Sequence, residues 1–410
     1  MEYLSVSEAQ RCVLDKVPVP DVETVGIEHC LGRVLACDVT ANRDHPPYDV
    51  SAMDGFAVRS ADIGGAALTI VEDIKAGEMP GKVLAEGQCA RIMTGAPVPQ
   101  GADAVVRVED TRELSDDSVQ IDVAVKPGHD IRLRGETMRS GDVVLSAGTE
   151  ITPGVIGMLA MVKSATLQVY RRPRVAILST GDELEGLNDP FDPNKIPDAN
   201  SYALMAQVQA LGIEPVLLGI ARDDPEELRE FLQRGLDYDV LLVSGGTSVG
   251  VHDYVRPTIE ALGVEMLFWR VSMKPGHPMA FGVGEDTLVF GLPGNPVSSM
   301  VCFEQFVAPA LRRMMGYPRC HRRTLQARLA SPLKRRAGRT EYVRVKLSRD
   351  QDGYVANVTG TQSSGVLLSM AHADGLLAIS SDCAALATGD EVTVQLLDGT
   401  AFQSETGYKE

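Results

Sequence analysis

The sequence predicts a mixed α/β protein of several domains, built around a doubly wound parallel α/β domain at 174–316. Apolar runs such as 174–178 and 240–243 lack polar alternation and are separated by helical segments, which is typical of parallel strands covered on both faces. Residues 25–137 instead show short apolar runs broken by Gly and Pro, which indicates β structure. Alternating residues return after about 325 and predict a small C-terminal β-barrel.

The α/β domain is expected to alternate strands and helices. Asp224 is a helix cap, because it precedes a proline that suits the first helical turn. Strands are expected at 174–178, 216–218, 240–243, 267–269 and 288–290. Helices are expected at 201–211, directly after Asp224, and from Pro296 to about Met315.

The remaining regions show fewer helical signals. Ser5 and Glu8 form the pattern of a capping box, and Thr152 with Pro153 predicts a helix over 154–162. Strands are expected at 56–58, 68–71, 104–106, 141–145 and 342–346. The domains expected from these changes are 1–24 with 138–173 (a helical linker domain), 25–137 (an inserted β-rich domain), 174–316 (the α/β domain) and 317–410 (the β-barrel domain).

Composition indicates a cytoplasmic protein. No stretch of about 18 apolar residues predicts a membrane span, and the first residues lack the basic and apolar regions of a signal peptide. The seven cysteines are scattered and never spaced CxxC, which argues against a disulfide framework and a zinc site.

The charge is negative overall but unevenly distributed. A formal net charge of −17 argues against nucleic-acid binding, because phosphate attraction requires a basic face. Between Arg312 and Lys346, however, Glu341 is the single acid among twelve Lys or Arg residues. This run is either a solvated face or an anion-attracting wall beside a site.

Candidate site residues fall where the predicted strands end, which is where ligands bind in an open parallel sheet. The turn with Gly245, Gly246 and Ser248 suits a phosphate, although it matches neither a P-loop nor a dinucleotide fingerprint. Glu183, Asp223 and Asp253 follow separate strands and suit Mg²⁺ bridging to phosphates; alternatively, they cap helices. Lys274 is a candidate phosphate contact and His277 a weaker one, because a lone His is more often structural.

Six motifs together resemble the molybdopterin molybdenumtransferase family, which includes the E domain of gephyrin. They are SAMDGFAV from Ser51, RIMTGAPVP from Arg91, STGDEL from Ser179, SGGTSVG from Ser244, MKPGHP from Met273 and GLPGNPVS from Gly291. They occur in the family's order, and the resemblance extends over essentially the whole chain.

The resemblance implies a homodimer of four-domain subunits with an active cleft formed between subunits. Its implied reaction inserts molybdate into adenylylated molybdopterin, with release of AMP and use of Mg²⁺. Asp54 and Thr94 are implied to reach the cleft from the partner subunit, while Glu183, Asp223 and Asp253 supply acids. The implied substrate-binding residues are Gly245, Gly246, Ser248, Lys274, His277, Pro293, Asn295, Pro296, Ser298, Arg344 and Ser364, of which Lys274, Ser298, Arg344 and Ser364 match residues that handle molybdate. Candidate protein partners are the adenylyltransferase of the same pathway and acceptor molybdoenzymes.

The sequence departs from the family pattern at Thr137, Val251 and His277, where the family often has Asp, an acid and Lys. Two alternatives remain: the adenylyltransferase itself, which would be one short domain, and a scaffold that has lost catalysis. Retention of Asp54, Glu183, Asp223 and Asp253 argues against the scaffold. Molybdate and tungstate, similar in size and charge, are not distinguished.

Overall fold

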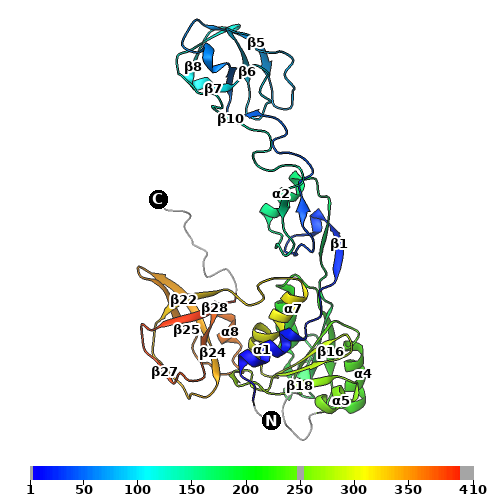
Figure 1. Ribbon diagram of the computed structural model, residues 1–410. Helices are drawn as coiled ribbons and strands as arrows, with labels where there is room; N and C mark the ends of the chain where they lie inside the picture. Colours follow the sequence, from blue (N-terminus) through cyan, green and yellow to red (C-terminus); the bar gives the residue numbers. More distant parts are fainter. Residues whose placement is uncertain (1–2, 247–253, 398–410) are drawn as a thin grey trace. The chain divides into compact units, whose positions relative to one another are not determined.

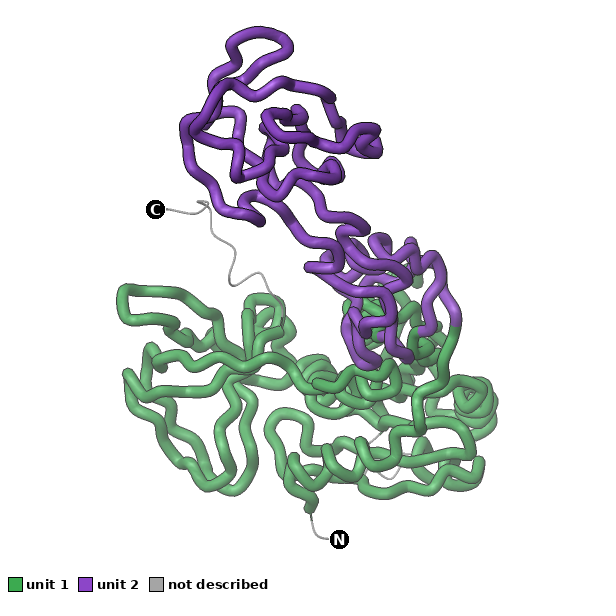
Figure 2. Tube along the Cα trace, turned by 45° about the horizontal axis from the view of Figure 1, so that its top comes forward, with its two compact units in different colours: residues 1–23, 32–34, 169–410 green, residues 24–31, 35–168 purple. Residues whose placement is uncertain are grey.

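The computed structural model describes residues 3–246 and 254–397. The chain divides into two compact units, which Figure 2 shows in separate colours. Unit 1 comprises 1–23, 32–34 and 169–410, and unit 2 comprises 24–31 and 35–168. The predicted boundaries of four domains remain a prediction. In the described part of the chain, no helix has the length and apolar character needed to span a membrane.

Unit 2 contains the β-rich region, and its main sheet has the strand order β7-β4-β6-β5-β9-β8 (Figure 1). Both faces of this sheet are covered: Phe56 and Val106 face one apolar cluster, whereas Ala57 and Val105 face another. The strands are β4 (Gly55–Val58), β5 (Leu68–Ile74), β6 (Gln88–Ile92), β7 (Ala104–Arg107), β8 (Thr111–Ser115) and β9 (Ser118–Ile121). The strands expected at 56–58, 68–71 and 104–106 are therefore confirmed.

The rest of unit 2 holds short strand pairs and one helix. The predicted helix is α2 (Pro153–Met161), and the Thr152 hydroxyl accepts a hydrogen bond from the Val155 N–H. Further strands are β2 (Val39–Thr40), β3 (Val50–Ser51), β10 (Ile131–Arg132) and β11 (Val143–Leu145). β1 (Val22–Gly26) and β12 (Thr166–Tyr170) lie where the chain passes between the units.

Unit 1 is built on a six-stranded sheet of order β16-β13-β17-β21-β20-β18. Its strands are β13 (Val175–Thr180), β16 (Val216–Ala221), β17 (Val240–Ser244), β18 (Glu265–Phe268), β20 (Ala280–Val283) and β21 (Leu288–Leu292). β16, β13, β17 and β21 are parallel, as expected. β20 was not among the expected strands, and it runs antiparallel to both neighbours.

Helices cover both faces of this sheet, which confirms the doubly wound fold. Along β13, Ile177 packs toward α1 (Val6–Asp15), α3 (Ala199–Gln209) and the helices after β21, whereas Leu178 packs toward α4 (Pro225–Gly235) and α5 (Val255–Ala261). The capping box of α1 is present. α1 packs within unit 1.

The single helix expected from Pro296 to about Met315 is interrupted. It consists of α6 (Pro296–Cys302), a π-helical turn (Phe303–Val307) and α7 (Ala308–Met314). Within that turn the buried Glu304 accepts hydrogen bonds from Arg322 and from the Gln207 amide, both at 2.7 Å. The wider turn coincides with this buried ion pair, which joins the helix to the chain leading into the barrel.

The C-terminal region forms a closed barrel of the strands β24-β25-β22-β28-β26, because β24 pairs with both β25 and β26. These strands are β22 (Thr324–Leu329), β24 (Thr340–Asp350), β25 (Gly353–Val358), β26 (Gly375–Ile379) and β28 (Glu391–Leu396). β19 (Met273–Lys274) pairs in parallel with β24 and joins the barrel to the α/β domain. Smaller elements of unit 1 are β14 (Leu184–Glu185), β15 (Ile196–Pro197), β23 (Leu333–Lys334), β27 (Ala385–Leu386) and α8 (Leu368–Ala371).

Candidate functional site

The four parallel strands of unit 1 end in register at one edge of the sheet. Thr180 pairs with Ala221, and Ser244 pairs with Ser179 on one side and Leu292 on the other. The segments after these residues therefore meet at the carboxyl edge, where ligands bind in open α/β sheets. The predicted residues Glu183, Asp223, Gly245 and Pro293 all follow these strand ends.

The turn after β17 requires glycine twice. Gly245 and Gly246 have φ of 94° and 60°, and a Cβ on Gly245 would lie 2.5 Å from the Thr180 carbonyl oxygen. A Cβ on Gly246 would overlap a methyl group of Val255. The buried Thr180 hydroxyl lies against both glycines and has no hydrogen-bond partner among the described residues. The absence of side chains at both positions lets the backbone of this turn approach a phosphate closely.

Glu183 and Asp223 lie exposed after the adjacent strands β13 and β16. The two turns are joined, since the Gly181 N–H donates to Ala221 O at 3.1 Å and the Asp223 N–H donates to the Asp182 carboxylate at 3.3 Å. Within 3–246 and 254–397, no three His, Cys, Asp or Glu side chains form a metal-binding group. The predicted third acid, Asp253, and Ser248 lie outside the described residues.

The Arg344 side chain is buried in β24, and all of its described hydrogen bonds go to neutral acceptors. It is 1% exposed, and its guanidinium donates to the Ser369 hydroxyl and to the carbonyls of Tyr342 and Ser363 at 3.2–3.3 Å. Burial lowers the pKa of Arg344, while Glu341 opposes this effect. A buried cation without a directly bonded carboxylate favours an anionic ligand nearby.

The loop after β25 brings further predicted residues to Arg344. Ser364 follows the Ser363 carbonyl that Arg344 contacts, and its own carbonyl accepts a hydrogen bond from the Val297 N–H at 3.2 Å. Val297 lies in α6 between Pro296 and the buried Ser298. The structure therefore brings Asn295, Pro296, Ser298, Arg344 and Ser364 into one region of unit 1.

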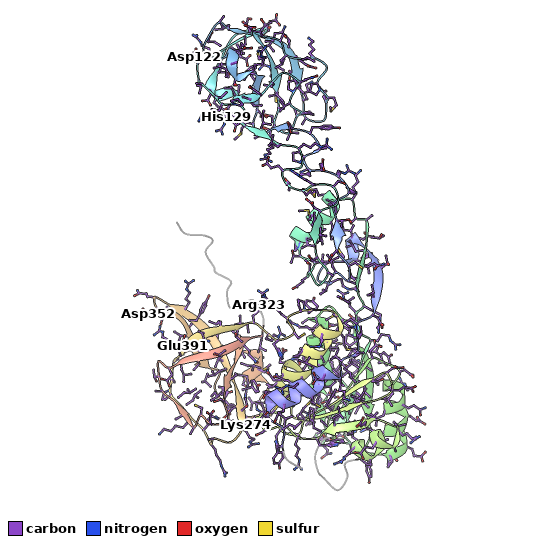
Figure 3. The ribbon with its side chains drawn as sticks, viewed as in Figure 1. Asp122, His129, Lys274, Arg323, Asp352 and Glu391 are labelled. Atoms are coloured by element: carbon purple, nitrogen blue, oxygen red, sulfur yellow. The ribbon has the colours of Figure 1, made fainter. Side chains whose placement is uncertain are left out.

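Lys274 is held by an acid that the sequence-based site did not include. Its Nζ lies 2.8 Å from Glu341, and Arg335 donates to the other carboxylate oxygen at 2.8 Å. Burial raises the pKa of Glu341, but the bonds from Lys274 and Arg335 outweigh it and keep the pKa below its ordinary value. Lys274 lies where the α/β domain meets the barrel (Figure 3).

His277 is tied to the backbone next to Lys274. Its Nδ1 lies 2.8 Å from Val271 O, and its ring packs on Tyr3 with centroids 5.0 Å apart. A carbonyl only accepts, so Nδ1 carries the hydrogen. An anion at Nε2 would therefore be favoured only when the ring is protonated.

Asp54 and Thr94 come together in unit 2. Gly55, the first residue of β4, pairs with Ile92, the last of β6, so Asp54 and Thr94 lie just beyond the paired strands. The Thr94 N–H and hydroxyl donate to Asp54 Oδ1 at 2.6 and 2.7 Å. These two bonds lower the pKa of Asp54, although slight burial opposes them. Thr137, where the family often has an acid, donates its N–H to His45 O at 3.0 Å.

Asn200 was also missed by the sequence-based site. Its side-chain amide donates to the Ser244 hydroxyl and to Gly294 O, both at 2.7 Å. The partners lie 44 and 94 residues away, and the only local signal is its place two residues after the helix cap Asp198.

The basic run from Arg312 to Lys346 is mostly a solvated face, with four of its twelve Lys and Arg residues tied into the fold. Arg322 pairs with Glu304, Arg328 with Asp350 and Arg335 with Glu341, and Arg344 is buried. The exposed members are Arg313, Arg319, Arg323, Lys334, Arg336, Arg339 and Lys346.

A parallel edge with glycine turns, exposed carboxylates and a buried arginine is typical of enzymes that bind phosphorylated, anionic ligands. Three family models match the chain: the MoeA N-terminal region (domain I and II) over 4–162, the probable molybdopterin binding domain over 176–313 and the MoeA C-terminal region (domain IV) over 326–397. A molybdopterin molybdenumtransferase of Staphylococcus aureus is 33% identical and covers 98% of this chain and 97% of its own length. A molybdopterin molybdenumtransferase of Nostoc sp. is 36% identical and covers 95% of this chain and 93% of its own length.

Solved structures agree. The molybdopterin biosynthesis moeA protein from Pyrococcus horikoshii has a TM-score of 0.82 and 30% identity, and it covers 96% of this chain and 100% of its own length. The chain belongs to the molybdopterin molybdenumtransferase family, whose members are enzymes of molybdenum cofactor biosynthesis. The adenylyltransferase alternative, a single short domain, does not fit a chain matched in three successive regions.

Proposed function

We propose that the protein inserts molybdate into adenylylated molybdopterin and releases AMP in a Mg²⁺-dependent reaction. The observation that carries this proposal is the carboxyl edge of the unit 1 sheet, where a glycine turn and two exposed carboxylates follow adjacent parallel strands. Unit 1 also holds the buried Arg344. An adenylylated substrate brings a pyrophosphate, and molybdate is a dianion, so the ligand needs both backbone donors and cations.

Mg²⁺ fits the donor set of the described residues. The ion binds oxygen ligands and usually takes one or two carboxylates together with water and substrate phosphates. Glu183 and Asp223 supply two exposed carboxylates at adjacent strand ends. We assign them to the metal, with Asp253 as the third acid predicted from the sequence. The bound ion would neutralise pyrophosphate charge, while Gly245, Gly246 and Ser248 hold the phosphates.

The molybdate contacts are assigned to Lys274, Ser298, Arg344 and Ser364, with His277 as a further donor in its protonated form. Pro293, Asn295 and Pro296 shape the turn that carries Ser298. The support is the shared region around Arg344 and the fixed positions of Lys274 and His277. Preference between molybdate and tungstate is left open by these contacts, which recognise charge and tetrahedral shape.

The protein is further proposed to act as a homodimer in which Asp54 and Thr94 of one subunit complete the site of the other. Asp54 is exposed and therefore accessible to a bound substrate or metal, and the hydrogen bonds from Thr94 lower its pKa. A cytoplasmic location accords with the seven scattered cysteines, none of them spaced CxxC. The adenylyltransferase and acceptor molybdoenzymes remain candidate partners.

Glu183→Gln tests the proposed chemistry. The variant should lose AMP release by about 100-fold or more while its thermal unfolding midpoint stays unchanged, because an exposed carboxylate contributes little packing. Arg229→Gln, an exposed change on α4, is the matched control and should retain activity. Full wild-type turnover in metal-free buffer with EDTA, or full activity of Glu183→Gln, would contradict the metal role.

A further inference from the structure

The amino-terminal end of α3 joins three strand ends of the unit 1 sheet through side-chain hydrogen bonds. The helix cap Asp198 accepts from the Ser201 N–H at 3.1 Å and from the Ser179 hydroxyl at the end of β13 at 3.0 Å. Asn200 then donates to Ser244 at the end of β17 and to Gly294 O after β21. All of these groups lie at the carboxyl edge described above.

The chemistry of Asn200 is fixed by its partners. The Gly294 carbonyl can only accept, so the atom facing it must be the amide nitrogen. The second hydrogen of the same nitrogen is then available to the Ser244 hydroxyl. One amide group therefore connects two turns that local sequence does not connect, and both bonds are 2.7 Å long.

The two turns lie close enough that an added side-chain carbon would bring them into van der Waals contact. A Cβ placed on Gly294 would be 3.8 Å from Gly245 Cα, and the Gly245 N–H donates to Leu292 O at 3.1 Å. A small movement of the 293–295 turn would thus change the space beside Gly245. Asn200 is the side chain that restrains both turns from the α3 side.

We propose that Asn200 is a positioning residue that sets the spacing between the Gly245–Gly246 turn and the 293–295 turn, and thereby the affinity for the phosphate groups of the substrate. This inference rests on the proposed function. It adds a residue that contacts neither the metal carboxylates nor Arg344 in the described hydrogen bonds and that acts through backbone geometry.

Asn200→Asp is the discriminating variant, because it keeps the size of the side chain and removes the donors at neutral pH. The KM for adenylylated molybdopterin should rise about tenfold or more at neutral pH, since the hydrogen bond to Gly294 O is lost and a carboxylate then faces a carbonyl. The effect on kcat should be smaller, because Asn200 positions the phosphate-binding turns and does not contact the reacting atoms. This split between KM and kcat is the readout that a general loss of structure would not give.

Ala206→Glu adds a negative charge to the exposed face of α3 and should leave KM unchanged. A variant to wild-type KM ratio for Asn200→Asp within twofold of one, or a fall in kcat at unchanged KM, would overturn the inference. Calorimetric titration with AMP gives the same comparison without turnover. Wild-type protein that fails to release AMP contradicts the proposed reaction, whereas the AMP affinities still decide the role of Asn200.

Discussion

The pairing of Asp54 with Thr94 lowers the pKa of an exposed acid. Three features place the two residues together: the register of β4 and β6, the turn before Gly55, and the lack of room for a side chain at Gly55, where a Cβ would overlap Val106 O. The Thr94 N–H is the largest cause of the lowered pKa, followed by its hydroxyl. The acid therefore stays ionised to lower pH than an unpaired aspartate.

Thr94→Val should raise the pKa of Asp54 toward its ordinary value, but only in part, because the backbone bond remains. Thr94→Ser, which keeps the hydroxyl, is the control and should titrate like wild type. The side-chain carboxyl carbon of Asp54, followed by NMR against pH, gives the midpoint directly. An identical midpoint in the valine variant would show that the hydroxyl does not stabilise the charge.

Glu341 is a buried carboxylate shared by two cations, and its loss should destabilise unit 1. Glu341→Gln leaves Arg335, whose side chain is 6% exposed, without its acid, at a cost of roughly 3 kcal/mol. The pKa of Glu341 is lowered in the folded state, so its contribution is present above the ordinary value of 4.5 and is lost as pH falls through the folded value. The difference from wild type should therefore be full at pH 7 and should shrink in acid.

Asp350→Asn provides the matched control, because it breaks an exposed ion pair on the same strand, with Arg328. It should change the free energy of unfolding by less than about 1 kcal/mol. Thermal unfolding at pH 7 and pH 4 measures both variants. Equal losses of unfolding free energy in the two variants, or a loss in Glu341→Gln that does not depend on pH, would show that the ionised Glu341 does not stabilise the fold.

At the scale of elements, the Gly245–Gly246 turn after β17 has no room for one added carbon atom. Gly246→Ala adds a Cβ that overlaps Val255 at a φ of 60°. The displaced turn should reduce AMP release by about 100-fold, because small misplacements of binding groups are costly in catalysis.

Gly263→Ala is the control for backbone strain alone. Gly263 also has positive φ, at 89°, but a Cβ there meets nothing within 4 Å. It should cost roughly 1 kcal/mol of stability and leave turnover unchanged. Equal AMP release by both variants, measured beside wild type, would show that the Gly245–Gly246 turn does not contribute to the site.

Periodicity and turn residues were sufficient to predict most elements. Local signals mark the apolar strands of the α/β domain, the β-rich regions and the helix caps Ser5, Thr152 and Asp224. The structure contains all of these elements and caps. β20 was missed because its short, glycine-containing apolar run does not reveal which strand it pairs with. The π-helical turn was missed because one extra residue per turn leaves the spacing of apolar residues nearly unchanged.

The candidate site was predictable only where motifs exist. Motif residues at strand ends are brought together by the register of the sheet. Asn200 and Glu341 were missed because their partners are distant in sequence. Asn200 donates a hydrogen bond to Gly294 O, and Glu341 forms an ion pair with Lys274 on a neighbouring strand. Such roles depend on tertiary contacts that no local pattern encodes.

At the scale of the whole molecule, the proposed dimer makes a prediction about mixed subunits. A site formed by unit 2 of one chain and unit 1 of another is intact once in a dimer of Asp54→Ala and Glu183→Ala chains. Mixed dimers should therefore recover up to about half of wild-type AMP release.

Mixing Glu183→Ala with Arg344→Ala is the control, because both changes lie in unit 1 and each site would carry one of them. No recovery is expected there. Recovery in this control, or none in Asp54→Ala with Glu183→Ala after mixed dimers are verified by mass spectrometry, would contradict the shared site.

In the proposed function, molybdate insertion and AMP release are one reaction. This coupling is tested by the yield of AMP and of active molybdenum cofactor from purified protein, adenylylated molybdopterin and Mg²⁺, with and without molybdate. Equal molar yields of the two products are expected, both dependent on molybdate and on Mg²⁺. AMP release that proceeds equally without molybdate, or active cofactor formed without AMP, would contradict this coupling.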